Sequence, residues 1–118
     1  MYKVIITGSR NFQDYNLLKK ECDLFLHDIS DNIAVISGGR GGADKLGERY
    51  AREKGYWIRI ITDYSDKFGD VEYTVNERRA KEGHSLIAFW DGQSRGTRNM
   101  IDVAKQNGIE KIKIIQFK

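Results

Sequence analysis

Apolar residues concentrate in five short runs that are separated by longer amphipathic stretches. Residues 4–7, 33–37 and 85–90 are nearly continuous apolar runs, which is typical of strands buried on both faces of a parallel sheet. Residues 56–61 and 111–117 alternate more with polar side chains, and both are predicted to be strands as well. The partial alternation in 56–61 predicts a strand near an edge of the sheet.

Between the strands, apolar side chains recur at intervals of three and four residues, which is the pattern of a helix with one face on the sheet. This pattern covers residues 15–28, with Asp14 as the predicted N-cap, and recurs in residues 42–54 and 97–106. Residues 72–82 contain helix-forming residues but only a thin apolar stripe. We expect this helix to be partly exposed or to pack against another chain.

Five strands alternating with four helices predict an α/β domain with a doubly wound parallel sheet, because parallel neighbours need crossover connections that are almost always right-handed. The 118 residues fit a single domain that spans residues 1–118. No stretch approaches the length of a membrane span, and the chain enters a core-type strand within its first residues. We therefore expect a cytoplasmic protein with no membrane partner.

Charge and cysteine content narrow the function only slightly. The net charge of +3 is compatible with nucleic acid, with an anionic small ligand or with neither, since acidic and basic residues are interspersed along the chain. Cys22 is the single cysteine, so it has no partner for an internal disulfide, and its place on a helix face predicts a buried thiol. His27 and His84 have no second ligand at metal-binding spacing, so we predict no metal site.

Three glycine-bearing segments follow predicted strands, at residues 8–10, 37–44 and 91–97. Glycine lets the backbone approach a bulky anion, and a helix that begins just beyond the turn offers unpaired N–H groups. Because the carboxyl ends of parallel strands lie along one edge, we expect the three segments to meet in one crevice and hold a phosphate-bearing ligand. No G-x-G-x-x-G follows the first strand and no G-x-x-x-x-G-K-[ST] occurs, which disfavours an ordinary dinucleotide dehydrogenase and a P-loop nucleotidase.

Three motifs, in this order, resemble those of the SLOG superfamily, most closely its small stand-alone YspA-type members. They are Thr-Gly-Ser-Arg-Asn-Phe at 7–12, Ser-Gly-Gly-x-x-Gly-Ala-Asp at 37–44, and Ala-Phe-Trp-Asp-Gly-x-Ser-x-Gly-Thr-x-Asn-Met-Ile at 88–101. The superfamily includes the Lonely Guy phosphoribohydrolases, the DNA-processing DprA proteins and domains that sense NAD-derived or cyclic nucleotide signals. The resemblance implies a Rossmann-like fold and a nucleotide or nucleotide-derived ligand at the carboxyl ends of the strands.

The third motif departs from that of the hydrolases in the superfamily. Those enzymes carry Pro-Gly-Gly-x-Gly-Thr followed closely by a glutamate needed for chemistry, whereas the ten residues after Trp90 contain no glutamate. Residues 76–79, Asn-Glu-Arg-Arg, resemble the arginine-bearing helix motif, which implies that Arg78 meets a phosphate or a ribose. The YspA-type members carry an Arg-Asn pair on this helix after a Trp-bearing loop, where this chain has Val75-Asn76 and Tyr64. Tyr64 or Trp90 is the candidate to stack on a base.

The candidate ligand-binding residues come from the three glycine segments and from the helix at 72–82. Ser9 and Arg10 are predicted to donate to a phosphate, and the alternative for Arg10 is a pair with a surface carboxylate. Asp44 either caps the second helix or accepts ribose hydroxyls. Asp91 either forms a turn or acts as a general base if burial raises its pKa. The full predicted set is Gly8, Ser9, Arg10, Gly38, Gly39, Gly42, Asp44, Asn76, Arg78, Asp91, Gly92, Ser94, Gly96 and Thr97.

The first functional hypothesis is a non-catalytic, homo-oligomeric binding module. It would capture a nucleotide, or an NAD-derived or cyclic nucleotide signal, as a sensor or sequestering protein, and it would need no cofactor. Its pocket would use backbone N–H groups at Gly39, Gly42, Gly96 and Thr97, with Arg10 supplying charge. The missing glutamate favours binding over turnover.

Two alternatives belong to other functional classes. An N-glycosidic hydrolase acting on a nucleoside monophosphate would use Asp91 or Glu77 as the acid or base, with Arg78 holding the phosphate. A single-stranded DNA-binding protein of the DprA type would draw on the basic pI of about 9.0, and its affinity would fall steeply with salt.

Overall fold

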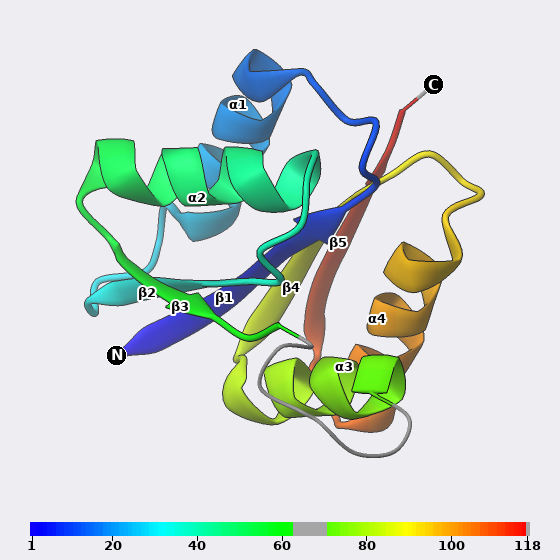
Figure 1. Ribbon diagram of the computed structural model, residues 1–118. Helices are drawn as coiled ribbons and strands as arrows, with labels where there is room; N and C mark the ends of the chain where they lie inside the picture. The colour runs from blue at the N-terminus through cyan, green and yellow to red at the C-terminus, as the bar shows by residue number, and fades with distance from the viewer. Residues whose placement is uncertain (63–70, 118) are drawn as a thin grey trace.

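Five strands alternate with four helices along the described chain (Figure 1). The computed structural model describes residues 1–62 and 71–117, with the side chains of 71–74 excepted. The strands are β1 (Tyr2–Gly8), β2 (Ile33–Ser37), β3 (Trp57–Ile60), β4 (Ser85–Trp90) and β5 (Lys111–Gln116). The helices are α1 (Tyr15–Leu26), α2 (Ala43–Lys54), α3 (Val71–Glu82) and α4 (Arg95–Gln106).

The strands form one all-parallel sheet in the order β3-β2-β1-β4-β5. The chain winds outwards from β1 through β2 to β3, then returns to the other side of β1 for β4 and β5. Helices α1 and α2 cover one face of the sheet, and α3 and α4 cover the other (Figure 1). The prediction of a Rossmann-like, doubly wound sheet is confirmed, and β3 lies at an edge as its alternation indicates.

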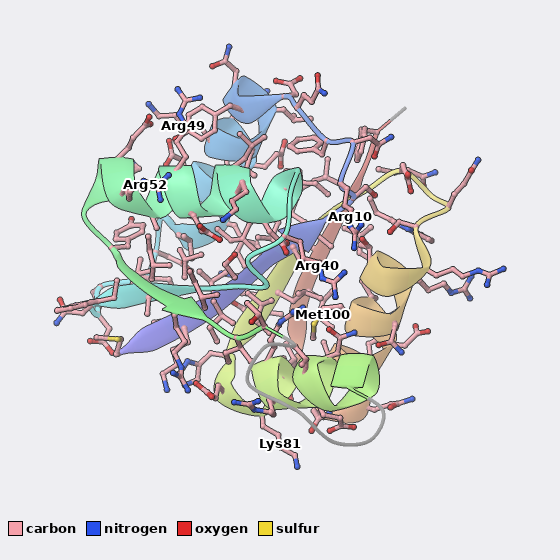
Figure 2. The ribbon with its side chains drawn as sticks, viewed as in Figure 1. Arg10, Arg40, Arg49, Arg52, Lys81 and Met100 are labelled. Atoms are coloured by element: carbon pink, nitrogen blue, oxygen red, sulfur yellow. The ribbon has the colours of Figure 1, made fainter. Side chains whose placement is uncertain are left out.

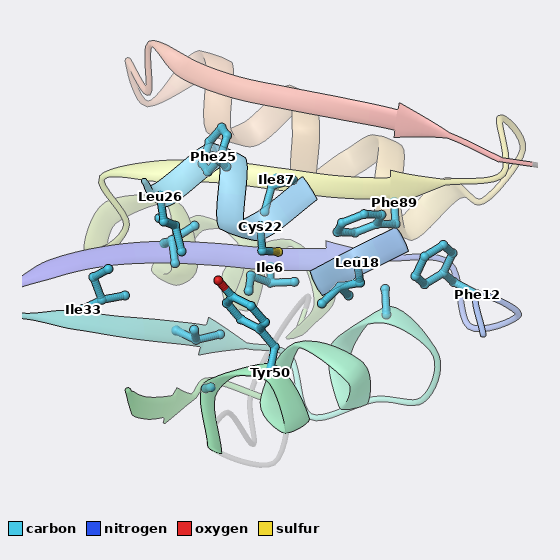
Figure 3. Close-up of a cluster of buried hydrophobic side chains, with 14 residues drawn as sticks. Ile6, Phe12, Leu18, Cys22, Phe25, Leu26, Ile33, Tyr50, Ile87 and Phe89 are labelled. Carbon is cyan, nitrogen blue, oxygen red and sulfur yellow. The ribbon is translucent and has the colours of Figure 1, made fainter. Parts of the chain in front are cut away.

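Alternate residues of the central strands face the two helical layers, because successive side chains of a strand point to opposite faces. On the side of α3 and α4, Ile5, Leu86 and Met100 belong to one buried cluster (Met100 in Figure 2). Towards α1 and α2, Ile6 packs in a cluster that includes Cys22 (Figure 3). The predicted burial of Cys22 is confirmed, and this burial raises the pKa of its thiol.

The helix ends follow from side-chain and backbone capping. Asp14 Oδ1 accepts a hydrogen bond from Leu17 N at 3.0 Å, which confirms Asp14 as the N-cap of α1. Helix α1 ends at Leu26, two residues before the predicted end at 28. Helix α4 begins at Arg95, two residues before the predicted start, because the turn that precedes it is complete by Ser94. None of the described helices is long and apolar enough to cross a membrane.

Candidate functional site

A cavity of about 400 Å³ lies at the carboxyl ends of the neighbouring strands β1 and β4. This is the point where the sheet changes its winding direction, and open α/β sheets bind their ligands at such points. The loop after β1, the segment that leads into α2, the inner side of α3 and the start of α4 form its wall. Segments far apart in the sequence therefore meet around one space.

Ser9 joins three of these segments. Its backbone N–H donates to Phe89 O on β4 at 2.9 Å, and its carbonyl accepts from Ala43 N at the start of α2 at 3.3 Å. Its side-chain Oγ accepts from Asp91 N in the loop after β4 at 3.1 Å. Gly42 lies against this junction with φ of 65°, and a Cβ atom there would fall 2.3 Å from Ser9 O. The junction thus explains the glycine and holds the starts of α2 and α4 in a fixed relation.

The loop into α4 is built around the carboxylate of Asp91. Asp91 Oδ1 accepts from Gln93 N at 2.9 Å and from Ser94 N at 2.8 Å. These N–H groups hold the pKa of Asp91 below its usual range. The general-base hypothesis for Asp91 requires a raised pKa, so the structure favours its alternative role as a turn-forming residue.

The first turn of α4 faces the cavity through Ser94, Gly96 and Thr97. Ser94 is the N-cap residue, but its side chain makes no capping hydrogen bond to the helix. Its Oγ instead lies 3.2 Å from Thr97 Oγ1. The amino end of α4 therefore presents two hydroxyls, backbone N–H groups and the positive end of the helix dipole at the cavity, a combination that suits an anion.

Asp44 is a buried carboxyl group in the cavity wall and is only 4 % exposed. Its Oδ2 accepts from Arg40 N at 3.2 Å, and its Oδ1 has no hydrogen-bond partner among the described residues. Burial raises the pKa of Asp44 to about 6, against the opposing positive charge of Arg79. Gly42, not Asp44, occupies the N-cap position of α2, so the predicted capping role of Asp44 is wrong.

Arg79 reaches the same place from the opposite face of the sheet. It is 7 % exposed, its Nε donates to Ile61 O at 3.0 Å, and its Nη1 donates to Asn76 Oδ1 at 3.0 Å. A Cβ atom on Gly38 would fall 2.6 Å from Asp44 Oδ2 and 2.7 Å from Arg79 Nη2. The carboxylate from α2 and the guanidinium from α3 therefore approach each other over the end of β2.

The comparisons with known proteins agree with this architecture. Residues 2–60 match the YspA, cpYpsA-related SLOG family. This chain belongs to that SLOG family. It is also similar to the Gene 61 protein of Mycobacterium phage D29, with 30% identity over 117 aligned residues that cover 92% of this chain and 93% of that protein. No solved structure matches the chain.

The SLOG chain brings most of the predicted ligand-binding residues together around the cavity. Those that line it are Gly8, Ser9, Arg10, Asp44, Asn76, Asp91, Ser94, Gly96 and Thr97. The predicted glycines that do not line it lie in the same loops, at positions 38, 39, 42 and 92. Of these, Gly38 and Gly42 allow the close approaches described above.

The helix α3 contributes a different arginine from the predicted one. Arg79 lines the cavity and Arg78 does not. Glu77 also lies outside the cavity, and its carboxylate accepts from Asn107 Nδ2, beyond the end of α4, at 3.3 Å. Sequence reasoning missed Arg79 and Arg40. Helical spacing from Val75 admits both Arg78 and Arg79 on the buried side, so the spacing alone could not have selected Arg79.

No aromatic ring lines the described part of the cavity wall of this SLOG protein. Trp90 is half-buried, and its Nε1 donates to Ser94 O at 3.0 Å, so it supports the loop before α4. Tyr64, the other candidate to stack on a base, lies outside the described residues.

Proposed function

We propose that this SLOG protein binds a nucleotide or a nucleotide-derived signalling molecule in the cavity between β1 and β4, as a non-catalytic sensor or sequestering module. The observation that supports this most strongly is the meeting of the α4 amino end with three arginines around one cavity. A phosphate group is the anion that both features suit, since helix N–H groups and guanidinium groups donate to its oxygens.

The balance of charge around the cavity supports an anionic ligand. Arg10, Arg40 and Arg79 line it together with the carboxyl groups of Asp44 and Asp91. Arg79 is buried against Asp44, whereas Arg10 is exposed at the end of β1. Arg10 and Arg40 lie between the start of α2 and α4 (Figure 2). A cavity with this excess of positive charge attracts phosphates from solution.

The size of the cavity favours a ligand with a single nucleotide unit. Its volume of about 400 Å³ lies towards the lower end of the range for small-molecule sites. A mononucleotide or a cyclic mononucleotide therefore suits it better than a whole dinucleotide. Among the described residues of the wall, Val75 adds an apolar side chain to polar side chains and two glycines.

Native mass spectrometry of the purified protein, followed by calorimetric titration with nucleoside monophosphates, tests this function. Arg10→Ala is expected to weaken binding by about tenfold or more, because a charge-assisted hydrogen bond to phosphate is lost. Arg52→Ala is the matched control, since Arg52 is exposed near the other end of α2 (Figure 2). The proposal would be refuted if none of the nucleotides bound to the wild-type protein. It would also be refuted if Arg10→Ala and Arg52→Ala changed the affinity equally.

One observation supports hydrolysis as the second candidate function. Asp44 is buried in the cavity wall with a pKa raised to about 6, close to the range in which a carboxyl group exchanges protons at neutral pH. In such a reaction water would add to the anomeric carbon, and the base would leave with a proton. Chromatography after incubation with nucleoside monophosphates tests this, because release of base far in excess of protein would establish turnover.

A further inference from the structure

The cavity wall contains a buried acceptor that the described residues leave unsatisfied. Asp44 Oδ2 accepts from Arg40 N, but Asp44 Oδ1 has no hydrogen-bond partner among the described residues. The side chain is 4 % exposed, so bulk water offers little compensation. Buried polar atoms in folded proteins nearly always have a partner, and one without a partner inside a cavity wall indicates a donor that the ligand brings.

The charges around Asp44 restrict the chemistry of that donor. The guanidinium of Arg79 approaches it from α3, Arg40 lies in the preceding loop, and the carboxyl of Glu48 lies one turn along α2. Glu48 is itself held by Ser37 Oγ at 2.6 Å. The two arginines balance the carboxyl groups of Asp44 and Glu48, so no net negative charge attracts a cationic donor, and a phosphate would be repelled by the Asp44 carboxylate. The donor is therefore neutral.

Asp44 is held in a fixed relation to the phosphate position proposed at the start of α4. Ala43, its neighbour, donates to Ser9 O at 3.3 Å. Ser9 Oγ accepts from Asp91 N, and Asp91 Oδ1 accepts from Ser94 N. In a nucleoside 5′-phosphate the sugar joins the phosphate to the base, so the sugar hydroxyls are the neutral donors closest to the phosphate.

We infer that Asp44 accepts a hydrogen bond from a ribose hydroxyl and makes the cavity selective for ribonucleotides over deoxyribonucleotides. This inference rests on the proposed nucleotide-binding function. Arg79 acts as a positioning residue, because its hydrogen bonds to Ile61 O and Asn76 Oδ1 fix a positive charge that faces Asp44 from the opposite helical layer.

Calorimetric titration at pH 7.5 with the four ribonucleoside 5′-monophosphates, and with their 2′-deoxy and 3′-deoxy counterparts, tests the inference. Removal of the recognised hydroxyl is expected to weaken binding by about tenfold or more, because a hydrogen bond to a charged group is lost. Asp44→Ala is expected to make the affinities for the ribonucleotides and for both deoxy series equal, and Asp44→Asn is expected to reduce the preference for ribonucleotides. Asp102→Asn, an exposed carboxyl group on α4 outside the cavity, is expected to keep it.

The outcomes separate this inference from the proposed function. Equal affinities of the wild-type protein for the ribonucleotides and for both deoxy series would overturn the role of Asp44 and leave nucleotide binding intact. Binding of none of the three series would overturn the inference and the proposed function together. A preference for ribonucleotides that survives in Asp44→Ala would also overturn the inference about Asp44. If Asp44→Ala does not fold, the preference of the wild-type protein is compared at pH 7.5 and pH 5. Protonation of Asp44 should reduce this preference, whereas the phosphate group titrates equally in all three series. A preference unchanged between the two pH values would count against the inference.

Discussion

At the level of single residues, two opposite charges are buried near each other in the cavity wall. Asp44 and Arg79 come from helices on opposite faces of the sheet and approach each other over the end of β2. Opposite charges that are buried near each other contribute little net stability, because desolvation offsets most of the attraction. Such groups concentrate where a protein binds or reacts, which supports a role for Asp44 and Arg79 in the proposed nucleotide site.

The ionisation of Asp44 makes a prediction about stability and pH. Its pKa is about 6 in the folded protein and 3.8 as the ordinary value, so the folded state binds the proton more tightly than the unfolded state. The stabilising contribution is therefore fully present below pH 3.8 and is lost as pH rises through 6, a change on the order of 3 kcal/mol.

Urea unfolding of the wild-type protein and of Asp44→Asn, each between pH 4 and pH 7, measures this contribution. The other carboxyl groups titrate alike in both proteins. The wild-type free energy of unfolding should decline relative to that of the variant as pH rises across this interval. Parallel profiles would show that Asp44 titrates in the folded protein as it does in the unfolded chain.

Gly38 provides a steric test of the same pair. A methyl group at this position would fall 2.6 Å from Asp44 Oδ2 and 2.7 Å from Arg79 Nη2, so Gly38→Ala must push the pair apart. We expect a loss of about 1–3 kcal/mol in the free energy of unfolding and weaker nucleotide binding. Gly41→Ala is the matched control, because a Cβ there has no neighbour within 4 Å. Equal effects of the two substitutions on binding would argue against a role for the pair.

Among the secondary-structure elements, α3 is the one whose rotation about its own axis could not be predicted from the sequence. The sequence predicts a helix over 72–82 and a ligand-contacting arginine within it, and the structure has α3 at Val71–Glu82 with an arginine in the cavity wall. Adjacent helical residues point about 100° apart, so Arg78 and Arg79 face different surroundings. Among the described side chains of α3, Val75 and Ala80 are the buried apolar ones. A stripe that thin leaves its rotation undetermined until the sheet and α4 are in place.

The same helix is joined to α4 by a side-chain bridge that begins at Arg79. Arg79 donates to Asn76 Oδ1, and Asn76 Nδ2 donates to Asn99 Oδ1 on α4. Asn99→Ala would leave the buried amide of Asn76 without its acceptor, so we expect a loss of about 1–3 kcal/mol in the free energy of unfolding.

Asn76 lines the cavity, and nucleotide affinity should therefore fall in Asn99→Ala together with stability. Arg98→Ala provides the comparison, because Arg98 is exposed on the same helix and its pair with Asp102 spans 3.9 Å on the surface. Chemical unfolding and calorimetry on both variants separate the outcomes. An Asn99→Ala protein as stable as Arg98→Ala would show that the bridge does not hold α3 to α4.

In the complete fold, the order of the strands brings separate turns together around one cavity. Local periodicity predicts the strands and helices, and the glycine turns predict an anion site at the carboxyl edge. The side of β1 on which each later strand lies depends on how the helical layers pack on the complete sheet. No single segment of the sequence encodes this packing. The order β3-β2-β1-β4-β5 places the turns after β1 and β4 side by side. The turn after β2 joins them through Ala43 and Asp44 at the start of α2.

An open sheet also leaves edges, and the edge at β3 carries large apolar side chains. Trp57 is 68 % exposed and Ile60 is 49 % exposed. The outer edge of such a strand presents backbone groups that a second chain can pair with. By contrast, the described apolar side chains of α3, Val75 and Ala80, are buried within the chain itself. Homo-oligomerisation, which the sequence predicts through residues 72–82, is therefore better supported at β3.

We expect the wild-type protein to associate with a second copy through β3, and Trp57→Lys to prevent this by placing a desolvated charge in the contact. Size-exclusion chromatography with light scattering should give a multiple of 13.6 kDa for the wild-type protein and 13.6 kDa for the variant. Leu24→Lys is the matched control, because Leu24 is 54 % exposed but lies on α1, away from the sheet edge. A wild-type mass of 13.6 kDa would rule out association, and dissociation by Leu24→Lys would place the contact on α1.

Because Trp57 does not line the cavity, Trp57→Lys should leave nucleotide affinity unchanged, so that assembly and binding are measured independently.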